Sequence, residues 1–140
     1  MAKVDEMQAL AASAETVWGL IGGYDALSDW HPAVERSVLE AGGRIRRLSL
    51  RGGGTLLERQ QAFSERERSY AYSIEEGPLP VAQYRSTLSV RDRGAGRGCE
   101  VYWSGDFAPA GASESDAVAV IRGIYRAGLD ALAKRFGDAS

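Results

Sequence analysis

The sequence predicts an α+β fold in which a curved antiparallel sheet of about seven strands packs against one long C-terminal helix. Short strand-like runs alternate with glycine-rich turns through the middle of the chain, and a helical apolar stripe follows them. Two short helices are expected between the first strand and the rest of the sheet. With 140 residues, we expect one domain spanning 1–140 that is large enough to bury a core.

The first strand is expected over residues 3–11. Ser13 has the side chain of a helix N-cap, with Thr16 at the third helical position, so a helix is expected over 14–21 and its end at Gly22-Gly23. A second short helix is expected over 25–30, because Pro32 prevents its continuation.

Six further strands are expected in the middle of the chain, since each run is bounded by turn residues such as Gly42-Gly43. They cover residues 34–40, 44–50, 55–64, 70–76, 83–91 and 99–107. Because the links between them are short, the strands should form an antiparallel meander.

The long helix is expected to begin after Ser113, in a capping box with Asp116 in place of Glu, and to run to Phe136. It should be roughly 30 Å long, enough to cross a small sheet. Its apolar stripe contains Ala117, Val120, Ile121, Ile124, Gly128, Ala131 and Leu132. Glycine weakens a helix, so Gly128 on this stripe predicts open volume between helix and sheet.

The composition excludes several classes of function. A net charge of −2 does not favour a nucleic-acid or acidic-membrane partner, and no apolar run is long enough for a membrane span. The only lysines, Lys3 and Lys134, lie near the termini and are poor candidates for Schiff-base chemistry. One cysteine, Cys99, cannot form an internal disulfide, and no signal peptide is visible, so we expect a cytoplasmic protein.

The single histidine, His31, lies between Trp30 and Pro32 and titrates near neutral pH. One interpretation makes it a general acid or base at a pocket mouth; the other makes it a ring that binds backbone and anchors the turn at Pro32. With one histidine and one cysteine, the chain has no material for a His/Cys zinc site, and no metal or cofactor is expected.

The chain resembles the START/Bet v 1-like (SRPBCC) superfamily, specifically its bacterial polyketide cyclase/dehydrase-type members, from Ser13 to about Phe136. The stretches that carry the resemblance are Val17-Trp18, Trp30-His31-Pro32, Arg44-Ile45-Arg46, Leu57-Glu58-Arg59, residues 70–74, residues 77–80, Tyr84, Val101-Tyr102-Trp103 and Gly128-Leu129. The resemblance implies the helix-grip fold, with the sheet wrapped around the C-terminal helix. Members of the superfamily carry lipids, hormones, polyketides and other apolar molecules, and only some are enzymes.

A more distant likeness to plant abscisic-acid receptors implies a set of pocket-lining positions. They fall on Leu48, Glu58, Tyr72, Ile74, Val81, Tyr84, Val120, Ile124 and Gly128. The receptors' gate loop is replaced here by 51–54 and their latch by 78–80, and their carboxylate-binding lysine has no counterpart. Hormone sensing is therefore not implied, although a loop over a pocket mouth is.

Strand alternation tests part of this likeness independently. If Leu48 and Leu50 face inward, so does Arg46, and an inward Glu58 on the neighbouring strand could pair with it. Because a buried ion pair is a poor source of stability, such a pair would point to a functional role. The alternative places both charges on the solvated face.

Aromatic side chains leave further alternatives open. Tyr72 and Tyr84 could orient a ligand in a cavity or be ordinary core residues. In the last strand, Tyr102 and Trp103 lie on opposite faces and compete for the interior. Two large aromatics on one face favour Trp103, whereas the receptor likeness favours Tyr102.

The resulting hypothesis is a cofactor-free protein that binds a small apolar or aromatic ligand, with Trp30 and Trp103 added to the ligand-binding set. The alternative is a metal-independent cyclase/dehydratase in which Arg46 stabilises an enolate-like oxygen and Glu58, His31 or a tyrosine moves a proton. A structural interaction module is a third hypothesis. Either a monomer or a homodimer is compatible with the sequence.

Overall fold

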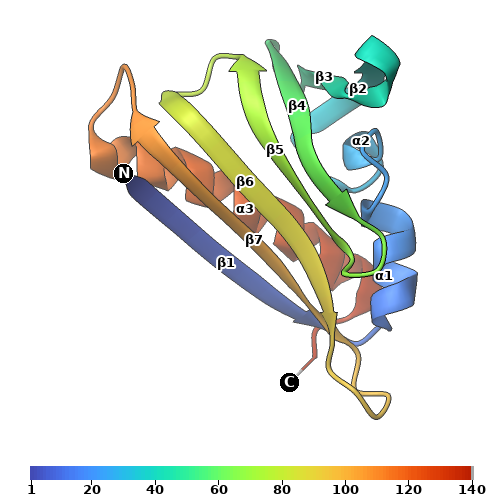
Figure 1. Cartoon of the computed structure of the whole chain (residues 1–140). Coiled ribbons are helices and arrows are strands. Elements are labelled where there is room, and N and C mark those ends of the chain that lie inside the picture. The colour runs from blue at the N-terminus through green and yellow to red at the C-terminus, as the bar shows by residue number, and fades with distance from the viewer. Residues whose placement is uncertain (140) are drawn as a thin grey trace.

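A seven-stranded antiparallel sheet forms the body of the computed structural model, which describes residues 1–139. The strands are β1 (Ala2–Leu10), β2 (Val34–Glu40), β3 (Ile45–Leu50), β4 (Thr55–Ser64), β5 (Ser69–Glu76), β6 (Val81–Asp92) and β7 (Cys99–Pro109). Their order is β1-β7-β6-β5-β4-β3-β2, so the first strand closes one edge beside the last, as Figure 1 shows.

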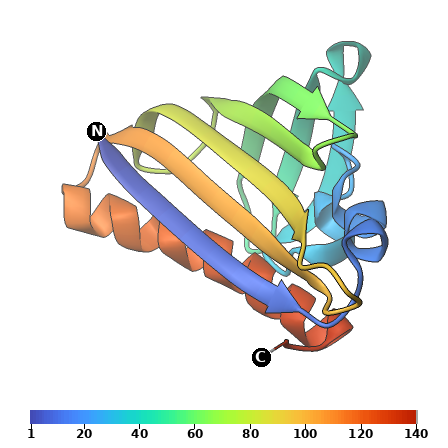
Figure 2. The ribbon, with the colours of Figure 1, turned by 60° about the horizontal axis from the view of Figure 1, so that its bottom comes forward.

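The long helix α3 (Glu114–Phe136) lies along the inner side of the curved sheet, beneath β1 and β7 in Figure 2. Ser113 caps it by accepting a hydrogen bond from the Asp116 N–H at 3.2 Å. The buried face of the helix comprises Ala117, Ile121, Tyr125, Gly128, Leu129 and Leu132. These residues meet the inward-facing positions of the strands and form the hydrophobic core.

Two short helices, α1 (Ala14–Ile21) and α2 (Leu27–Trp30), follow β1 and cover the end of the sheet that α3 leaves open (Figure 1). The predicted cap is confirmed, because Ser13 Oγ accepts from the Thr16 N–H at 3.1 Å. Burial of Val17, Trp18 and Ile21 fixes α1 against the core. The chain then enters β2 at Val34, two residues after Pro32.

The helix-grip fold is confirmed, and the remaining differences have local causes. The second helix begins at Leu27 rather than at residue 25, and a short 3-10 turn (Ala41–Gly43) joins β2 to β3. The sixth strand begins at Val81 rather than at residue 83. Val81 and Ala82 already pair with β7, and the register then shifts between Ala82 and Arg85. Gln83 lies in that shift with a φ of 54°, so the alternating pattern begins only after it.

Candidate functional site

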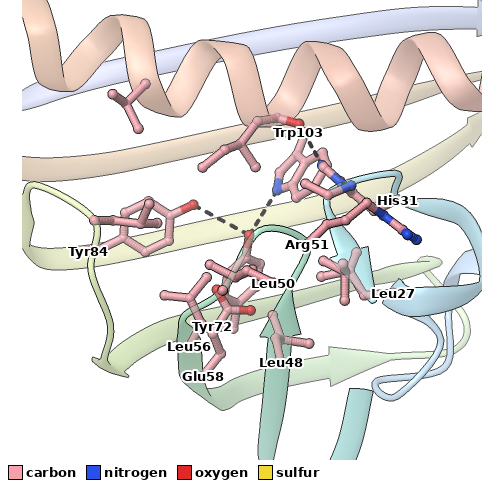
Figure 3. A pocket seen from close by; sticks show the side chains of 16 residues that line it. Leu27, His31, Leu48, Leu50, Arg51, Leu56, Glu58, Tyr72, Tyr84 and Trp103 are labelled. Carbon is pink, nitrogen blue, oxygen red and sulfur yellow. Dashed lines mark hydrogen bonds between the residues drawn. The ribbon is translucent and has the colours of Figure 1, made fainter. Parts of the chain in front are cut away.

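A cavity of about 280 Å³, enclosed on most sides and open to solvent at one end, lies between α3 and the concave side of the sheet. Its lining is largely apolar and comes from α2, the turn into β2, strands β3 to β7 and α3, as Figure 3 shows. The lining residues are Leu27, His31, Ala33, Val34, Leu48, Leu50, Arg51, Gly53, Leu56, Glu58, Tyr72, Leu79, Tyr84, Trp103, Val120 and Ile124. Ala33, Arg51, Gly53 and Val120 are exposed and mark its rim.

A buried ion pair lies at one wall of the cavity. Arg46 on β3 and Glu58 on β4 are direct register partners, so their side chains emerge side by side on the inner face. The Arg46 Nε donates to Glu58 Oε1 at 2.8 Å, and Nη2 lies 2.8 Å from the same oxygen. Both side chains are almost completely buried. The predicted inward pairing of these residues is confirmed.

Aromatic rings surround the Arg46 guanidinium, and one of them, Tyr72, also lines the cavity. Its Cζ lies 4.3 Å from the centroid of the Tyr24 ring and 4.7 Å from that of Tyr72. Its Nη1 donates to the Tyr70 hydroxyl at 3.1 Å. Such stacking favours a buried arginine, because it replaces lost hydration with ring quadrupoles. Burial raises the pKa of the Glu58 carboxyl, and the neighbouring Arg46 opposes that rise.

A chain of hydroxyl groups connects Tyr72 and Tyr84 in the cavity wall to Tyr125 on α3. Tyr72 Oη lies 3.4 Å from Tyr84 Oη, which lies 2.5 Å from Tyr125 Oη. The Trp103 Nε1 donates both to Tyr72 Oη and to Ser86 Oγ at 3.1 Å. Burial raises the pKa of the Tyr72 and Tyr84 phenols, so both stay neutral at physiological pH.

The His31 ring lines the cavity near its rim but is itself buried. Its Nε2 lies 2.8 Å from the Ile124 carbonyl oxygen, and its Nδ1 accepts from the Ala33 N–H at 3.1 Å. These partners define the neutral tautomer with the proton on Nε2. Burial lowers the pKa of His31 below its ordinary value. The ring therefore holds α3 to the turn before β2, with both nitrogens engaged.

The structure brings most of the predicted site residues to one cavity. The predicted residues that line it are His31, Leu48, Glu58, Tyr72, Tyr84, Trp103, Val120 and Ile124. The alternatives for β7 are decided in favour of Trp103, which is buried and stacks on Tyr125 with centroids 4.6 Å apart. Tyr102 lies on the outer face, where its hydroxyl donates to Glu100.

Five predicted residues do not reach the cavity wall: Arg46, Trp30, Ile74, Val81 and Gly128. Arg46 lies behind Glu58, so the predicted contact between its guanidinium and a ligand oxygen is not available in this geometry. The open volume predicted beside Gly128 is also wrong. A Cβ there would lie within 3.0 Å of the rings of His31, Trp103 and Trp30, which fill that space.

Several lining residues were not predicted as ligand contacts. Leu50 and Leu56 share strand faces with Leu48 and Glu58, so alternation alone could have added them. Ala33, Arg51, Gly53 and Leu79 lie in loops or turns, where no periodicity reveals which way a residue faces. Ser86, which joins the hydroxyl chain, gave no signal in the sequence.

The part of the chain that the structure describes shows no metal-binding cluster and no membrane-spanning helix. Residues 1–139 contain no cluster of three or more His, Cys, Asp or Glu side chains arranged to hold a metal ion. Cys99 is a buried thiol whose pKa is raised by burial, as expected for a packed core cysteine. None of the described helices is both long enough and apolar enough to cross a membrane.

These features define a class: helix-grip proteins of the START type, with an apolar cavity between the sheet and the long helix. The chain belongs to the family of polyketide cyclase/dehydrase and lipid transport proteins, whose model matches residues 1–137. A search of curated protein sequences found no match.

Solved structures agree with this assignment. The protein XoxI from Bacillus cereus is 40% identical, with a TM-score of 0.94 over 97% of this chain and 96% of that one. A putative uncharacterized protein from Bacillus thuringiensis is also 40% identical, with a TM-score of 0.94 over 98% and 100% of the two chains. The ZhuI aromatase/cyclase from Streptomyces sp. R1128 shares the fold at 17% identity, with a TM-score of 0.77 over 96% and 92%.

Proposed function

We propose that this protein binds a small hydrophobic or aromatic molecule in the cavity between the sheet and α3. The observation that carries the proposal is a preformed, mostly apolar cavity of about 280 Å³ that opens to solvent at a rim. Small-molecule sites typically enclose about 300–1,000 Å³, so this cavity suits a ligand of one or two rings. The aromatic side chains of Tyr72, Tyr84 and Trp103 offer ring faces and edges for such a ligand.

The location of the cavity supports the same proposal. Its walls come from elements far apart in the sequence, and the core around it is otherwise closely packed with large aromatics. A void in such a core removes packing contacts and so costs stability, which a bound ligand would offset. The family description, which combines polyketide cyclases with lipid transport, is compatible with an apolar ligand.

Native mass spectrometry of freshly purified protein tests the proposal, because a co-purifying apolar molecule would appear as a defined mass increment. The matched variants are Val120→Trp, which places an indole at the cavity rim, and Ala119→Trp, which places it at an exposed neighbouring position outside the cavity lining. We expect Val120→Trp to lose the increment and Ala119→Trp to keep it. Equal retention by both folded variants would place the ligand elsewhere and contradict the proposal.

A second candidate function is metal-independent acid–base catalysis of the cyclase/dehydratase type. The observation that favours it is the Glu58 carboxylate, which faces the cavity and can move a proton. Both nitrogens of His31 are engaged, which leaves Glu58 as the stronger candidate. A suitable probe is 4-hydroxy-4-phenyl-2-butanone, whose dehydration removes a proton and a hydroxide and yields a conjugated enone that absorbs in the near ultraviolet.

We expect the wild-type protein to accelerate this dehydration and Glu58→Gln to abolish the acceleration while remaining folded. The matched control is Glu75→Gln, which removes an exposed carboxylate paired with Arg59 on β4. A wild-type protein that binds the probe without accelerating its dehydration would contradict this second candidate and leave the binding proposal standing.

A further inference from the structure

We propose that the cavity selects a small ring-bearing ligand whose polar group is a hydrogen-bond donor, such as a phenol or an alcohol, and that Glu58 Oε2 accepts this bond. The inference rests on the proposed binding function and adds the chemical class of the ligand. The protein itself already uses most of the polar atoms at the cavity, and one acceptor remains.

Glu58 supplies the free acceptor. Both of its close contacts with Arg46, from Nε and from Nη2, involve the same oxygen, Oε1. Among residues 1–139, no group donates a hydrogen bond to Oε2. Glu58 is only 5% exposed as a residue yet lines the cavity, so its carboxylate has exchanged bulk water for the cavity interior. A carboxylate oxygen that is removed from bulk water and has no protein partner is costly, which favours a ligand that donates to it.

The hydroxyl chain supplies no free donor, because each of its protons is already used. Ser86 donates to the Ser104 carbonyl at 2.9 Å, so Tyr125 donates to Ser86 Oγ at 2.9 Å. Since a hydroxyl has one proton, Tyr84 must then donate to Tyr125, and in the 3.4 Å contact between Tyr72 and Tyr84 the donor can only be Tyr72. The chain of hydroxyls therefore runs in one direction, from Tyr72 at the cavity wall to the Ser104 carbonyl in the backbone of β7.

The remaining polar groups of the lining are also engaged or lie at the rim. The His31 Nε2 proton is held by the Ile124 carbonyl, and the Trp103 N–H is shared between Tyr72 and Ser86. Arg51 is exposed at the rim, where its Nε donates to the Pro32 carbonyl at 2.9 Å. The side chains of the cavity interior therefore present acceptors and no unused donor. Figure 3 shows two of these internal contacts, from Tyr72 to Tyr84 and from Trp103 to Tyr72.

This arrangement discriminates between ligands of the same shape. A ligand hydroxyl gains a hydrogen bond to a charged acceptor, whereas a ketone of equal size finds no unused donor in the cavity interior and leaves Glu58 unpaired. A ligand carboxylate meets the negative charge of Glu58 directly. Hydrogen bonds to charged groups are among the stronger ones in proteins, so we expect a preference of about tenfold for the hydroxyl-bearing ligand.

A series built on one bicyclic skeleton tests the inference: indane, 5-indanol, 1-indanone and indane-5-carboxylate. Binding is measured by titration calorimetry, with Trp103 fluorescence as a second readout from within the cavity wall. We expect 5-indanol to bind about tenfold more tightly than indane or 1-indanone, and indane-5-carboxylate to bind most weakly. This comparison within the wild-type protein does not depend on any variant folding.

The variant Glu58→Gln sharpens the test, because its amide oxygen can still accept from Arg46 while its NH₂ group faces the cavity as a donor. We expect the preference to reverse, with 1-indanone binding more tightly than 5-indanol. Glu75→Gln is the control with the same substitution at an exposed ion pair outside the cavity, and it should keep the wild-type order. An unchanged order in folded Glu58→Gln would overturn the inference.

The outcomes separate this inference from the proposed function. Saturable binding of indane and 5-indanol with equal affinity would overturn the donor preference while supporting an apolar ligand site. Tightest binding by 1-indanone or by the carboxylate would also overturn it. If none of the four compounds binds and Val120→Trp has no effect on any co-purifying mass, the proposed function itself fails.

Discussion

The imidazole of His31 fills the space beside Gly128, where a Cβ would lie 2.7 Å from His31 Cδ2. The same Cβ would lie 2.8 Å from a ring carbon of Trp103 and 2.9 Å from one of Trp30. Gly128 is therefore a point of close approach between α3 and the turn before β2. This contact, together with the His31 hydrogen bond to Ile124, connects the long helix to the rim of the cavity.

The first prediction concerns the size of the side chain at this contact. Gly128→Ala should destabilise the protein by about 1–3 kcal/mol, because three packed rings must move to admit one methyl group. Gly123→Ala on the same helix meets no atom within 4 Å and should stabilise it by up to about 1 kcal/mol. Urea unfolding of both variants measures the difference, and equal effects would refute the close approach.

The second prediction concerns pH and the single histidine. Burial lowers the pKa of His31 below its ordinary value of 6.5. Just below pH 6.5, the unfolded chain therefore binds a proton at His31 that the folded chain does not bind. This contribution to stability is therefore complete above about pH 6.5 and falls as the pH drops toward the folded-state pKa. The free energy of unfolding should decrease between pH 7.5 and pH 5.5 less steeply in His31→Gln than in the wild type. Parallel pH dependences would contradict the buried neutral ring.

The third prediction compares a buried with an exposed ion pair. Arg46→Met should cost about 3–5 kcal/mol, because it leaves the buried Glu58 carboxylate without its partner. Arg47→Met, at the next position, removes a pair with Glu40 in which both side chains are exposed, and should cost less than about 1 kcal/mol. The double variant Arg46→Met/Glu58→Leu should regain most of the loss. Denaturant titrations check all three values.

The fourth prediction concerns the end of the hydroxyl chain. Ser86→Ala removes the shared acceptor of Trp103 and Tyr125 in a buried position, and should cost about 1–3 kcal/mol. Ser89→Ala on the same strand removes a half-exposed hydroxyl from the other face and should change stability by less than about 0.5 kcal/mol. Thermal unfolding measures both effects. A neutral Ser86→Ala would show that water replaces the lost hydroxyl, which contradicts a closed network.

Much of the candidate site was accessible from the sequence, because side chains alternate along a strand. Alternation predicted an inward Arg46 on condition that Leu48 and Leu50 face inward, and the family resemblance favoured this placement, with Glu58 as its partner, over the solvated face. Alternation could not choose between Tyr102 and Trp103, since both faces of β7 carry large aromatics. The choice depends on Tyr125 of α3, whose ring stacks on Trp103 and excludes the other face from the core.

The sequence by itself determined the elements and their order: the caps at Ser13 and Ser113, the breaks at glycine and proline, and the strand and helix periodicities are all local properties of the chain. Only the tertiary structure decided where space remains. Gly128 predicted a void, but rings from α2, the turn after it and β7 converge there and fill it, while the cavity opens beside Glu58 instead. Packing is a property of surfaces that meet from distant parts of the chain, so no local pattern specifies which surfaces fail to touch.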